Sequence, residues 1–342
     1  MPASRARWYD AAEGPGYSRP IAPHRAGLFR TTLALALLVV GAAAGPARAG
    51  DGGAPPGHMV ERTFTNEAGT RRYQVYVPTA GAAGRPLMVW LHGCGRPGRM
   101  EAGHGLAAVA EERRFALAYP LQDRAANIEN CWNWFTPPDR RRGSGEASII
   151  AGITTTLERE LHVDPDRVYV GGFSAGGAMT TVMGAAYPDL YAAIAPSSGA
   201  PYALDPSGAS AYEEMGPRAR PVPVFLLQGL ADEISVYPIG RTNLLQWLQT
   251  DDDADDGHRN GSVSRLPATT ATQLPGPGSP LPLVVEDYRG ADGCLLGQFL
   301  TSPADHVVDG ALLYEDVGLG IQRQMMDFLL GHRRGAARQG CG

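Results

Sequence analysis

The chain has 342 residues, a formal net charge of −5 at pH 7, and 44% hydrophobic residues. This length is ample for one large α/β domain with a buried core. The mildly acidic charge favours no nucleic-acid partner, so we expect none.

The first 49 residues have the features of an export signal. Basic residues precede a short apolar run at 31–40, and Ala47-Arg48-Ala49 is typical of a small-x-small cleavage site. A transmembrane anchor is the alternative, but the run is too short and too rich in small residues to span a bilayer comfortably. We therefore expect a cleaved signal peptide at 1–49, a linker at 50–65, and a secreted protein without stable membrane insertion.

Strand and helix patterns alternate through the rest of the chain. Residues 71–77 alternate like a half-buried strand, and later apolar runs are continuous, as in strands buried on both faces. These runs lie at 86–91, 115–119, 167–170, 192–195 and 222–227, with helical patterns at 100–112, 146–161, 175–186 and 320–330. The alternation predicts an α/β fold with a mostly parallel sheet and helices on both faces. We place this domain at 66–333, followed by a C-terminal tail at 334–342.

Two segments interrupt the alternation. Residues 201–220 are rich in Gly, Pro and Ser, and could form part of a lid. Residues 250–282 begin with an acidic run, Asp251–Asp256, and continue polar and proline-rich. A cation site is one interpretation of the acidic run, but we expect a solvated insertion loop. Neither an internal repeat nor a Ser/Thr-rich linker to a second module is visible.

The strongest functional signal is Gly172-Phe173-Ser174-Ala175-Gly176, which matches GxSxG. It lies between a predicted strand and a predicted helix, the context of the nucleophile elbow found in the α/β-hydrolase fold. The glycines allow a sharp turn and keep side chains away from the adjacent strand and helix. The helix N-terminus favours developing negative charge. We therefore predict Ser174 as a nucleophile.

A serine hydroxyl needs a neighbouring base, and the chain order in this fold is Ser, then acid, then His. We favour His306 as the base, since it lies shortly before the last predicted helix. His258 falls in the acidic insertion and His332 falls near the tail. Asp232 follows a predicted strand, where a carboxylate can reach the histidine ring, and Glu233 is the alternative acid.

An oxyanion hole requires two preorganised N–H donors. The backbone N–H of Ala175, directly after the nucleophile, is one candidate. The other is the N–H of Cys94, in the loop that follows the predicted strand at 86–91. His92 in the same loop precedes the acid in the chain, which is the wrong order for the base. We interpret it as a structural residue that forms hydrogen bonds within the loop.

The chain has four cysteines: Cys94, Cys131, Cys294 and Cys341. An even number in an exported chain indicates two disulfides with three possible pairings. We favour Cys94–Cys131 and Cys294–Cys341. The spacing includes no CxxC and no clustered histidines, so we predict no metal site. Acyl transfer by a serine, a histidine and an acid needs no cofactor, and we expect none.

Several motifs resemble the polyhydroxybutyrate depolymerase family of esterases, which is close to the feruloyl and acetylxylan esterases of carbohydrate esterase family 1. They are residues 86–94, 130–135, 142–146 and 164–178, of which Cys-Trp-Asn-Trp-Phe followed by Arg-Gly-x-Gly-Glu is quite specific. The resemblance is strong from about residue 84 to 200 and weaker at 222–238 and 283–330. It implies Ser174, Asp232 and His306 as the catalytic triad and short hydroxyacyl esters as substrates.

The sequence departs from the family pattern beside the acid and the base. The family often has His where this chain has Gln228, and it tends to flank its catalytic histidine with Gly and an aromatic residue. Here the flanking residues are Asp305 and Val307. Trp132 and Trp134 are candidates for an aromatic wall over the substrate, with packing in the core as the alternative.

These observations predict a secreted serine esterase that acts on short-chain or hydroxyacyl esters, either small molecules or oligomers. A feruloyl or acetylxylan esterase with the same triad is one alternative. A non-catalytic binding protein built on a hydrolase scaffold is another. The sequence does not indicate the oligomeric state.

Overall fold

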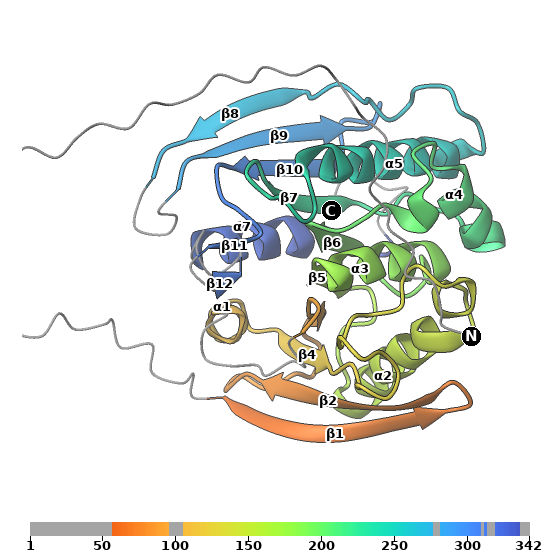
Figure 1. Ribbon diagram of the computed structural model, residues 1–342. Helices are drawn as coiled ribbons and strands as arrows, with labels where there is room; N and C mark the ends of the chain where they lie inside the picture. Colours follow the sequence, from red (N-terminus) through yellow and green to blue (C-terminus); the bar gives the residue numbers. More distant parts are fainter. Residues whose placement is uncertain (1–56, 96–104, 276–280, 309–310, 313–318, 336–342) are drawn as a thin grey trace, which may run out of the picture. The chain divides into compact units, whose positions relative to one another are not determined.

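The computed structural model of the chain describes residues 57–95, 105–275, 281–308, 311–312 and 319–335 (Figure 1). The chain divides into two units, Met1–Gly50 and Asp51–Gly342, and all of the described residues belong to the second. The predicted signal peptide at 1–49 lies outside the described residues, as do Cys341 and most of the predicted tail.

One ten-stranded sheet organises the domain, with strand order β1-β2-β4-β3-β5-β6-β7-β10-β9-β8. The strands are β1 His58–Asn66, β2 Gly69–Val77, β3 Leu87–Leu91, β4 Ala116–Pro120, β5 Val168–Phe173, β6 Ala193–Ser197, β7 Val224–Gly229, β8 Thr269–Gln273, β9 Leu283–Arg289 and β10 Leu295–Ser302. A separate small hairpin pairs β11 Val307–Val308 with β12 Ala311–Leu312. The helices are α1 Leu106–Arg113, α2 Gly145–Leu161, α3 Ala175–Ala186, α4 Ala209–Met215, α5 Tyr237–Asp256 and α7 Leu319–Leu330.

The central strands β4, β3, β5, β6, β7 and β10 run parallel, whereas the strands on both outer sides pair antiparallel. The carboxyl ends of the parallel strands therefore lie at one edge of the sheet. The loops that follow β3, β5, β7 and β10 meet there, which is where ligands bind in open α/β sheets.

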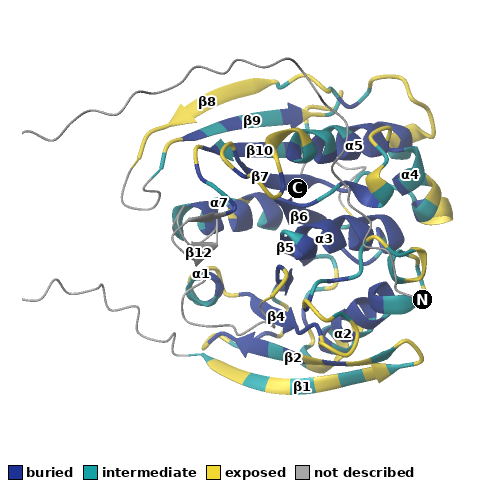
Figure 2. Ribbon diagram, in the orientation of Figure 1, coloured by how far each residue is buried: buried dark blue, intermediate teal, exposed yellow. Residues whose placement is uncertain are grey.

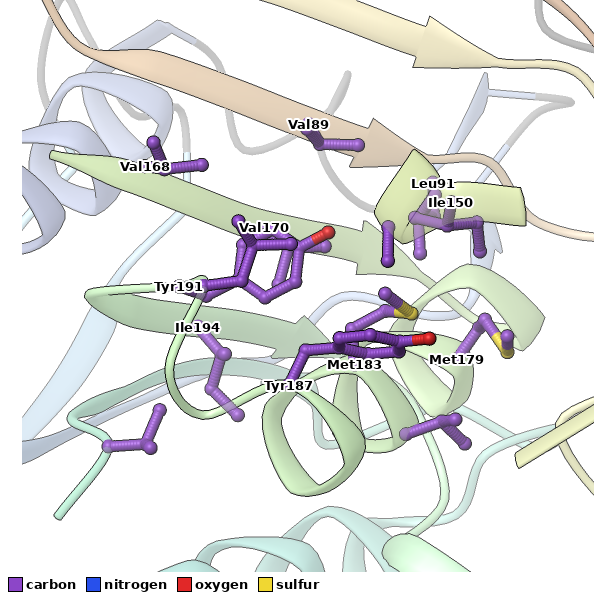
Figure 3. Packing of buried hydrophobic residues seen from close by; sticks show 14 of the residues in the cluster. Val89, Leu91, Ile150, Val168, Val170, Met179, Met183, Tyr187, Tyr191 and Ile194 are labelled. Carbon is purple, nitrogen blue, oxygen red and sulfur yellow. The ribbon is translucent and has the colours of Figure 1, made fainter. Parts of the chain in front are cut away.

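Two apolar layers cover the sheet, one on each face. Helices α2, α3 and α5 contribute to the first layer, and α1 and α7 contribute to the second. Figure 3 shows part of the first layer, where Val168 and Val170 of β5 and Met179 and Met183 of α3 belong to one buried cluster. The central strands are buried along their length, whereas β1 and β8 at the two edges carry most of the exposed positions (Figure 2). The predicted mostly parallel sheet with helices on both faces is confirmed.

The predicted linker at 50–65 is wrong from His58 onward, because that segment forms β1. Its residues pair with β2 in continuous register, from His58 opposite Val77 to Asn66 opposite Gly69. As an edge strand it is only half buried on one face, so its apolar signal is weak. Phe64 lies so close to α2 that a side chain at Gly152 would collide with its ring.

The predicted solvated loop at 250–282 is wrong at its acidic start, because α5 continues to Asp256. Asp251 and Asp252 are 0% and 2% exposed. Asp251 accepts a hydrogen bond from the N–H of Val222 at 2.7 Å, and Asp252 accepts one from the N–H of Val263 at 3.0 Å. Burial raises the pKa of Asp251 well above its ordinary range. These carboxylates hold neighbouring backbone in place, and β8 occupies a later part of the same segment.

Two other boundaries also differ from expectation. In the segment proposed as part of a lid, α4 buries Ala211 and Met215 in the first apolar layer, so this helix packs as part of the domain. Arg334, where the tail was expected to begin, donates a hydrogen bond from its N–H to the carbonyl of Asp166 at 2.9 Å. The domain therefore includes Arg334.

Candidate active site

Ser174 occupies a sharp turn between β5 and α3. Its backbone angles are φ 57° and ψ −121°, which a non-glycine residue rarely adopts. Neighbouring glycines allow the turn because other strands approach closely. A Cβ atom at Gly176 would lie 2.0 Å from the carbonyl oxygen of Leu91, and one at Gly177 would lie 2.4 Å from that of Ser197. The GxSxG segment therefore forms the elbow geometry expected for an exposed nucleophile.

The structure brings Ser174, His306 and Asp232 together from three loops at the carboxyl edge of the sheet. His306 Nε2 lies 3.1 Å from Ser174 Oγ, and His306 Nδ1 lies 2.8 Å from Asp232 Oδ2. With a proton on Nδ1 the ring donates to the carboxylate, and its Nε2 is free to accept the serine proton. The two hydrogen bonds connect the three side chains in series, which is the arrangement that a serine nucleophile, its base and an orienting acid require.

The loop after β7 fixes the Asp232 carboxylate. Its Oδ1 accepts hydrogen bonds from the backbone N–H groups of Ile234 at 3.0 Å and Ser235 at 2.7 Å. The Gln228 amide donates to the carbonyl of Ser235 at 2.6 Å and lies 3.5 Å from Asp232 Oδ2. Asp232 is 3% exposed, so the carboxylate is held by donors rather than by solvent. Gln228, where the related family often has histidine, supports this loop.

His306 follows β10, and its ring is buried against Phe173 at a centroid distance of 4.7 Å. Its backbone N–H donates to the Asp305 carboxylate, which gives that departure from the family pattern a local role. The other two candidate histidines lie elsewhere. His258 is exposed after α5, and the ring of His332 contacts the carbonyl oxygens of Phe328 and Leu295. Glu233, the alternative acid, is exposed.

The loop after β3 lies directly beside Ser174. A Cβ atom at Gly93 would lie 3.3 Å from Ser174 Cβ, so the backbone of this loop approaches Ser174 closely. Cys94 follows in the same loop and forms a disulfide with Cys131. Ala175 begins α3, where the first backbone N–H groups have no acceptor within the helix. Both predicted oxyanion donors therefore come from segments adjacent to Ser174.

His92 is 8% exposed and hydrogen-bonded on both sides of its ring. Its Nδ1 donates to the carbonyl of Gly93 at 2.7 Å, and its Nε2 accepts from the N–H of Gln122 at 3.0 Å. Burial lowers the pKa of His92 to about 4, so the ring is neutral at pH 7. These contacts agree with the interpretation of His92 as a structural residue of the loop.

The prediction that Trp132 forms part of a substrate wall is wrong. Its side chain is 0% exposed and belongs to the first apolar layer, with its ring 5.5 Å from that of His92. Trp134 is only partly buried and meets the Phe135 ring edge to face at 5.6 Å. In an extended strand, residues two apart share a face, but this segment is not a strand, so the two tryptophans differ in exposure.

Sequence reasoning overlooked an apolar surface on the loop that carries Asp232. Leu230 and Ile234 flank the acid and are 53% and 67% exposed. Large apolar residues on both sides of an acid at a strand end are the signal that could have indicated this surface. It lies on the same loop as Asp232, the predicted acid.

Other site predictions concern metals, membranes and the second disulfide. Within the described ranges, no group of three or more His, Cys, Asp or Glu residues could hold a metal ion. No helix in the described part of the chain is long and apolar enough to cross a bilayer. Cys294 is disulfide-bonded; its predicted partner, Cys341, lies outside the described residues.

Comparison with known proteins places these features in a family. The model of the family described as Esterase PHB depolymerase matches residues 71–246, which include Ser174 and Asp232 but not His306. The chain is 40% identical over 154 residues to poly(3-hydroxyalkanoate) depolymerase C of Paucimonas lemoignei, covering 45% of this chain and 37% of that protein. It is 37% identical over 150 residues to feruloyl esterase B of Neurospora crassa, covering 43% of this chain and 50% of that protein.

The chain thus matches half or less of the length of these two curated relatives. Among solved structures, acetyl xylan esterase from Aspergillus awamori is similar with a TM-score of 0.57 at 22% identity. This alignment covers 72% of the present chain and 94% of that one, and it supports the α/β-hydrolase type of fold. Because the family model matches just over half of the sequence, the chain belongs to the esterase PHB depolymerase family.

Proposed function

We propose that this protein is a serine esterase that hydrolyses short-chain or hydroxyacyl carboxylic esters through an acyl-enzyme. The observation that carries the proposal is the hydrogen-bonded series from Ser174 Oγ to His306 Nε2 and from His306 Nδ1 to Asp232 Oδ2. The strained elbow at Ser174 supports the same assignment, because such strain persists where surrounding structure enforces it and is common at active sites.

In the proposed acylation step, Ser174 Oγ attacks the ester carbonyl carbon while His306 Nε2 takes the serine proton. The carbonyl electron pair moves to oxygen and forms a tetrahedral oxyanion. As this intermediate collapses, the bond to the leaving alcohol breaks and His306 donates the proton to the alcohol oxygen. Water then repeats the sequence on the acyl-enzyme, releasing the acid and regenerating Ser174. Asp232 orients the ring and stabilises its charged form.

The backbone N–H groups of Ala175 and Cys94 are the proposed oxyanion donors. Donors that are already in place stabilise developing charge without reorganising during the reaction, and losing one such donor typically costs about 10²–10³ in kcat. The proximity of the Gly93 backbone to Ser174 supports the choice of this loop. The exposed Leu230 and Ile234 offer an apolar surface for the substrate beside the acid.

A feruloyl or acetylxylan esterase is the second candidate function. The relative named feruloyl esterase B, at 37% identity, favours it. A substrate panel of p-nitrophenyl acetate, p-nitrophenyl butyrate, methyl ferulate, acetylated xylan and soluble hydroxybutyrate oligomers would distinguish the candidates. We expect the butyrate ester and the hydroxybutyrate oligomers to be the best substrates. Higher kcat/KM on methyl ferulate or acetylated xylan would favour the second function.

The central test is Ser174→Ala, assayed with p-nitrophenyl butyrate and a fluorophosphonate probe. We expect kcat to fall by roughly 10⁴-fold or more and probe labelling to disappear, with the circular dichroism spectrum unchanged. His258→Ala is a matched control, since that exposed histidine lies outside the triad. Near wild-type turnover by Ser174→Ala would refute the mechanism, and an unlabelled wild-type protein would favour a non-catalytic binding function.

We further propose that residues 1–49 direct export and are removed. The catalytic domain then starts at β1 rather than at residue 66, because His58–Asn66 completes one side of the sheet.

A further inference from the structure

A cluster of buried polar side chains lies next to the loop that carries Cys94. Arg71 of β2, Gln122 after β4 and Glu146 in the first turn of α2 are 7%, 2% and 2% exposed. A buried charge is costly unless it is paired and hydrogen-bonded, so this arrangement needs a compensating role or a complete set of partners. Neither the triad nor the proposed oxyanion donors use any of these three side chains.

Glu146 is the acceptor on which the cluster converges. Its carboxylate accepts hydrogen bonds from Arg71 Nη2 at 3.1 Å, from the side-chain amide of Gln122, and from Asn133 twice. The two bonds from Asn133 come from its backbone N–H at 2.7 Å and from its Nδ2 at 2.9 Å. All four of these contacts are donors, so the surroundings of Glu146 complement a carboxylate, which accepts hydrogen bonds on both oxygens. Burial raises the pKa of Glu146, and these donors oppose that change.

Two routes connect the cluster to Cys94. On one side, Gln122 Nε2 donates to the carbonyl of Cys131 at 2.8 Å, and Glu146 binds Asn133 two residues later. The cluster thus restrains the segment from the carbonyl of Cys131 to Asn133, and the disulfide links this segment to Cys94.

The second route runs through the backbone that precedes Cys94. The backbone N–H of Gln122 donates to His92 Nε2 at 3.0 Å, and His92 Nδ1 donates to the carbonyl of Gly93 at 2.7 Å. The Gly93 carbonyl belongs to the same peptide unit as the Cys94 N–H. The cluster therefore restrains the Gly93–Cys94 peptide in two ways. One is through His92 at the Gly93 carbonyl, and the other is through the disulfide of the Cys94 side chain.

We propose that Glu146 is a positioning residue for the oxyanion hole, setting the direction of the Cys94 N–H through Gln122 and the segment from Cys131 to Asn133. The inference rests on the proposed esterase function. This role would account for the glutamate at the end of the Arg-Gly-x-Gly-Glu motif, which is Glu146 and is not part of the proposed triad. A shift of about 1 Å in a reacting geometry can cost roughly 10²-fold in rate, so loss of this restraint reduces catalysis without removing a reacting group.

The test is Glu146→Gln, which keeps the size of the side chain but turns an amide NH₂ toward one of the donors. At a temperature well below unfolding, we expect kcat to fall roughly 10- to 100-fold and KM to change by less than about threefold. The Ki of a trifluoromethyl ketone, whose serine adduct carries an oxyanion, rises by the same factor as kcat/KM falls. A residue that supported only folding would lower the melting temperature and leave kcat and Ki per folded molecule unchanged.

Glu286→Gln is the matched control, because Glu286 also pairs with an arginine, Arg241 at 2.6 Å, but lies on β9 away from Cys94. We expect it to keep the wild-type kcat. If Glu146→Gln does not fold, Asn133→Ala removes only one of the four donors, and we expect a kcat loss of a few-fold with the same rise in Ki.

Wild-type kcat and Ki in a folded Glu146 or Asn133 variant would overturn the inference, as would equal losses in Glu146→Gln and Glu286→Gln. Ser174→Ala, measured in parallel, separates the two proposals. An inactive Ser174→Ala beside a fully active Glu146→Gln refutes the positioning role alone. Retained turnover in Ser174→Ala overturns the esterase mechanism and the inference together.

Discussion

Backbone strain at Ser174 should lower the stability of the fold. A side chain at φ 57° and ψ −121° costs of order 1–3 kcal/mol, because its Cβ is crowded by the adjacent backbone. Glycine adopts such angles freely. Ser174→Gly therefore removes the strain, whereas Ser174→Ala keeps it.

The comparison between these two variants isolates the strain. Both lose the serine hydroxyl and its hydrogen bond to His306, so that loss cancels. Glycine also lowers the free energy of unfolding by about 0.4–1 kcal/mol relative to alanine, because it increases the entropy of the unfolded chain. Subtracting this entropy difference from the relief of strain leaves a positive difference, and we expect Ser174→Gly to be more stable than Ser174→Ala by about 1 kcal/mol.

Urea unfolding followed by circular dichroism measures this difference directly. For a domain of this size, a difference of about 1 kcal/mol corresponds to a shift of about 2–4 °C in melting temperature. Both variants should lack esterase activity. A Ser174→Ala variant that is as stable as Ser174→Gly, or more stable, would refute the argument that the elbow is strained.

Three further predictions concern the rest of the chain. Burial lowers the pKa of His92 in the folded protein to about 4 from an ordinary value of 6.5, so the unfolded state binds more protons between these two pH values. The free energy of unfolding should therefore fall by up to about 3 kcal/mol as the pH drops from 6.5 to 4. Urea unfolding of His92→Asn should lack this part of the pH dependence. Replacing both Cys94 and Cys131 with Ser should lower the free energy of unfolding by about 4 kcal/mol, because the disulfide closes a loop with a sequence separation of 37 and so reduces the entropy of the unfolded chain. A loss below about 1 kcal/mol would contradict this. Intact mass of exported material should give an N-terminus near Gly50, and an unprocessed chain in a membrane fraction would contradict the signal-peptide assignment.

The sequence alone was sufficient where the signal is local and periodic. The apolar runs at the central strands indicated burial on both faces, and the predicted bounds of α3 at 175–186 match the structure. The elbow at Ser174 was predictable because GxSxG lies between a strand and a helix, a context that a short local segment defines. The cysteine count and the exported context indicated two disulfides but left three pairings open; the structure contains the favoured pair Cys94–Cys131.

Contacts between distant segments decided the rest. Polar composition predicted solvent exposure for Asp251 and Asp252, but these carboxylates are buried because backbone N–H groups of other segments bind them. Trp132 and Trp134 looked equivalent in sequence, yet only Trp132 is enclosed by the core. Chain order left three histidines as candidates for the base. His306 lies beside Asp232 only because the loops after β7 and β10 meet in the folded protein. Burial and hydrogen-bond partners depend on which segments meet in space, and local composition carries little information about that.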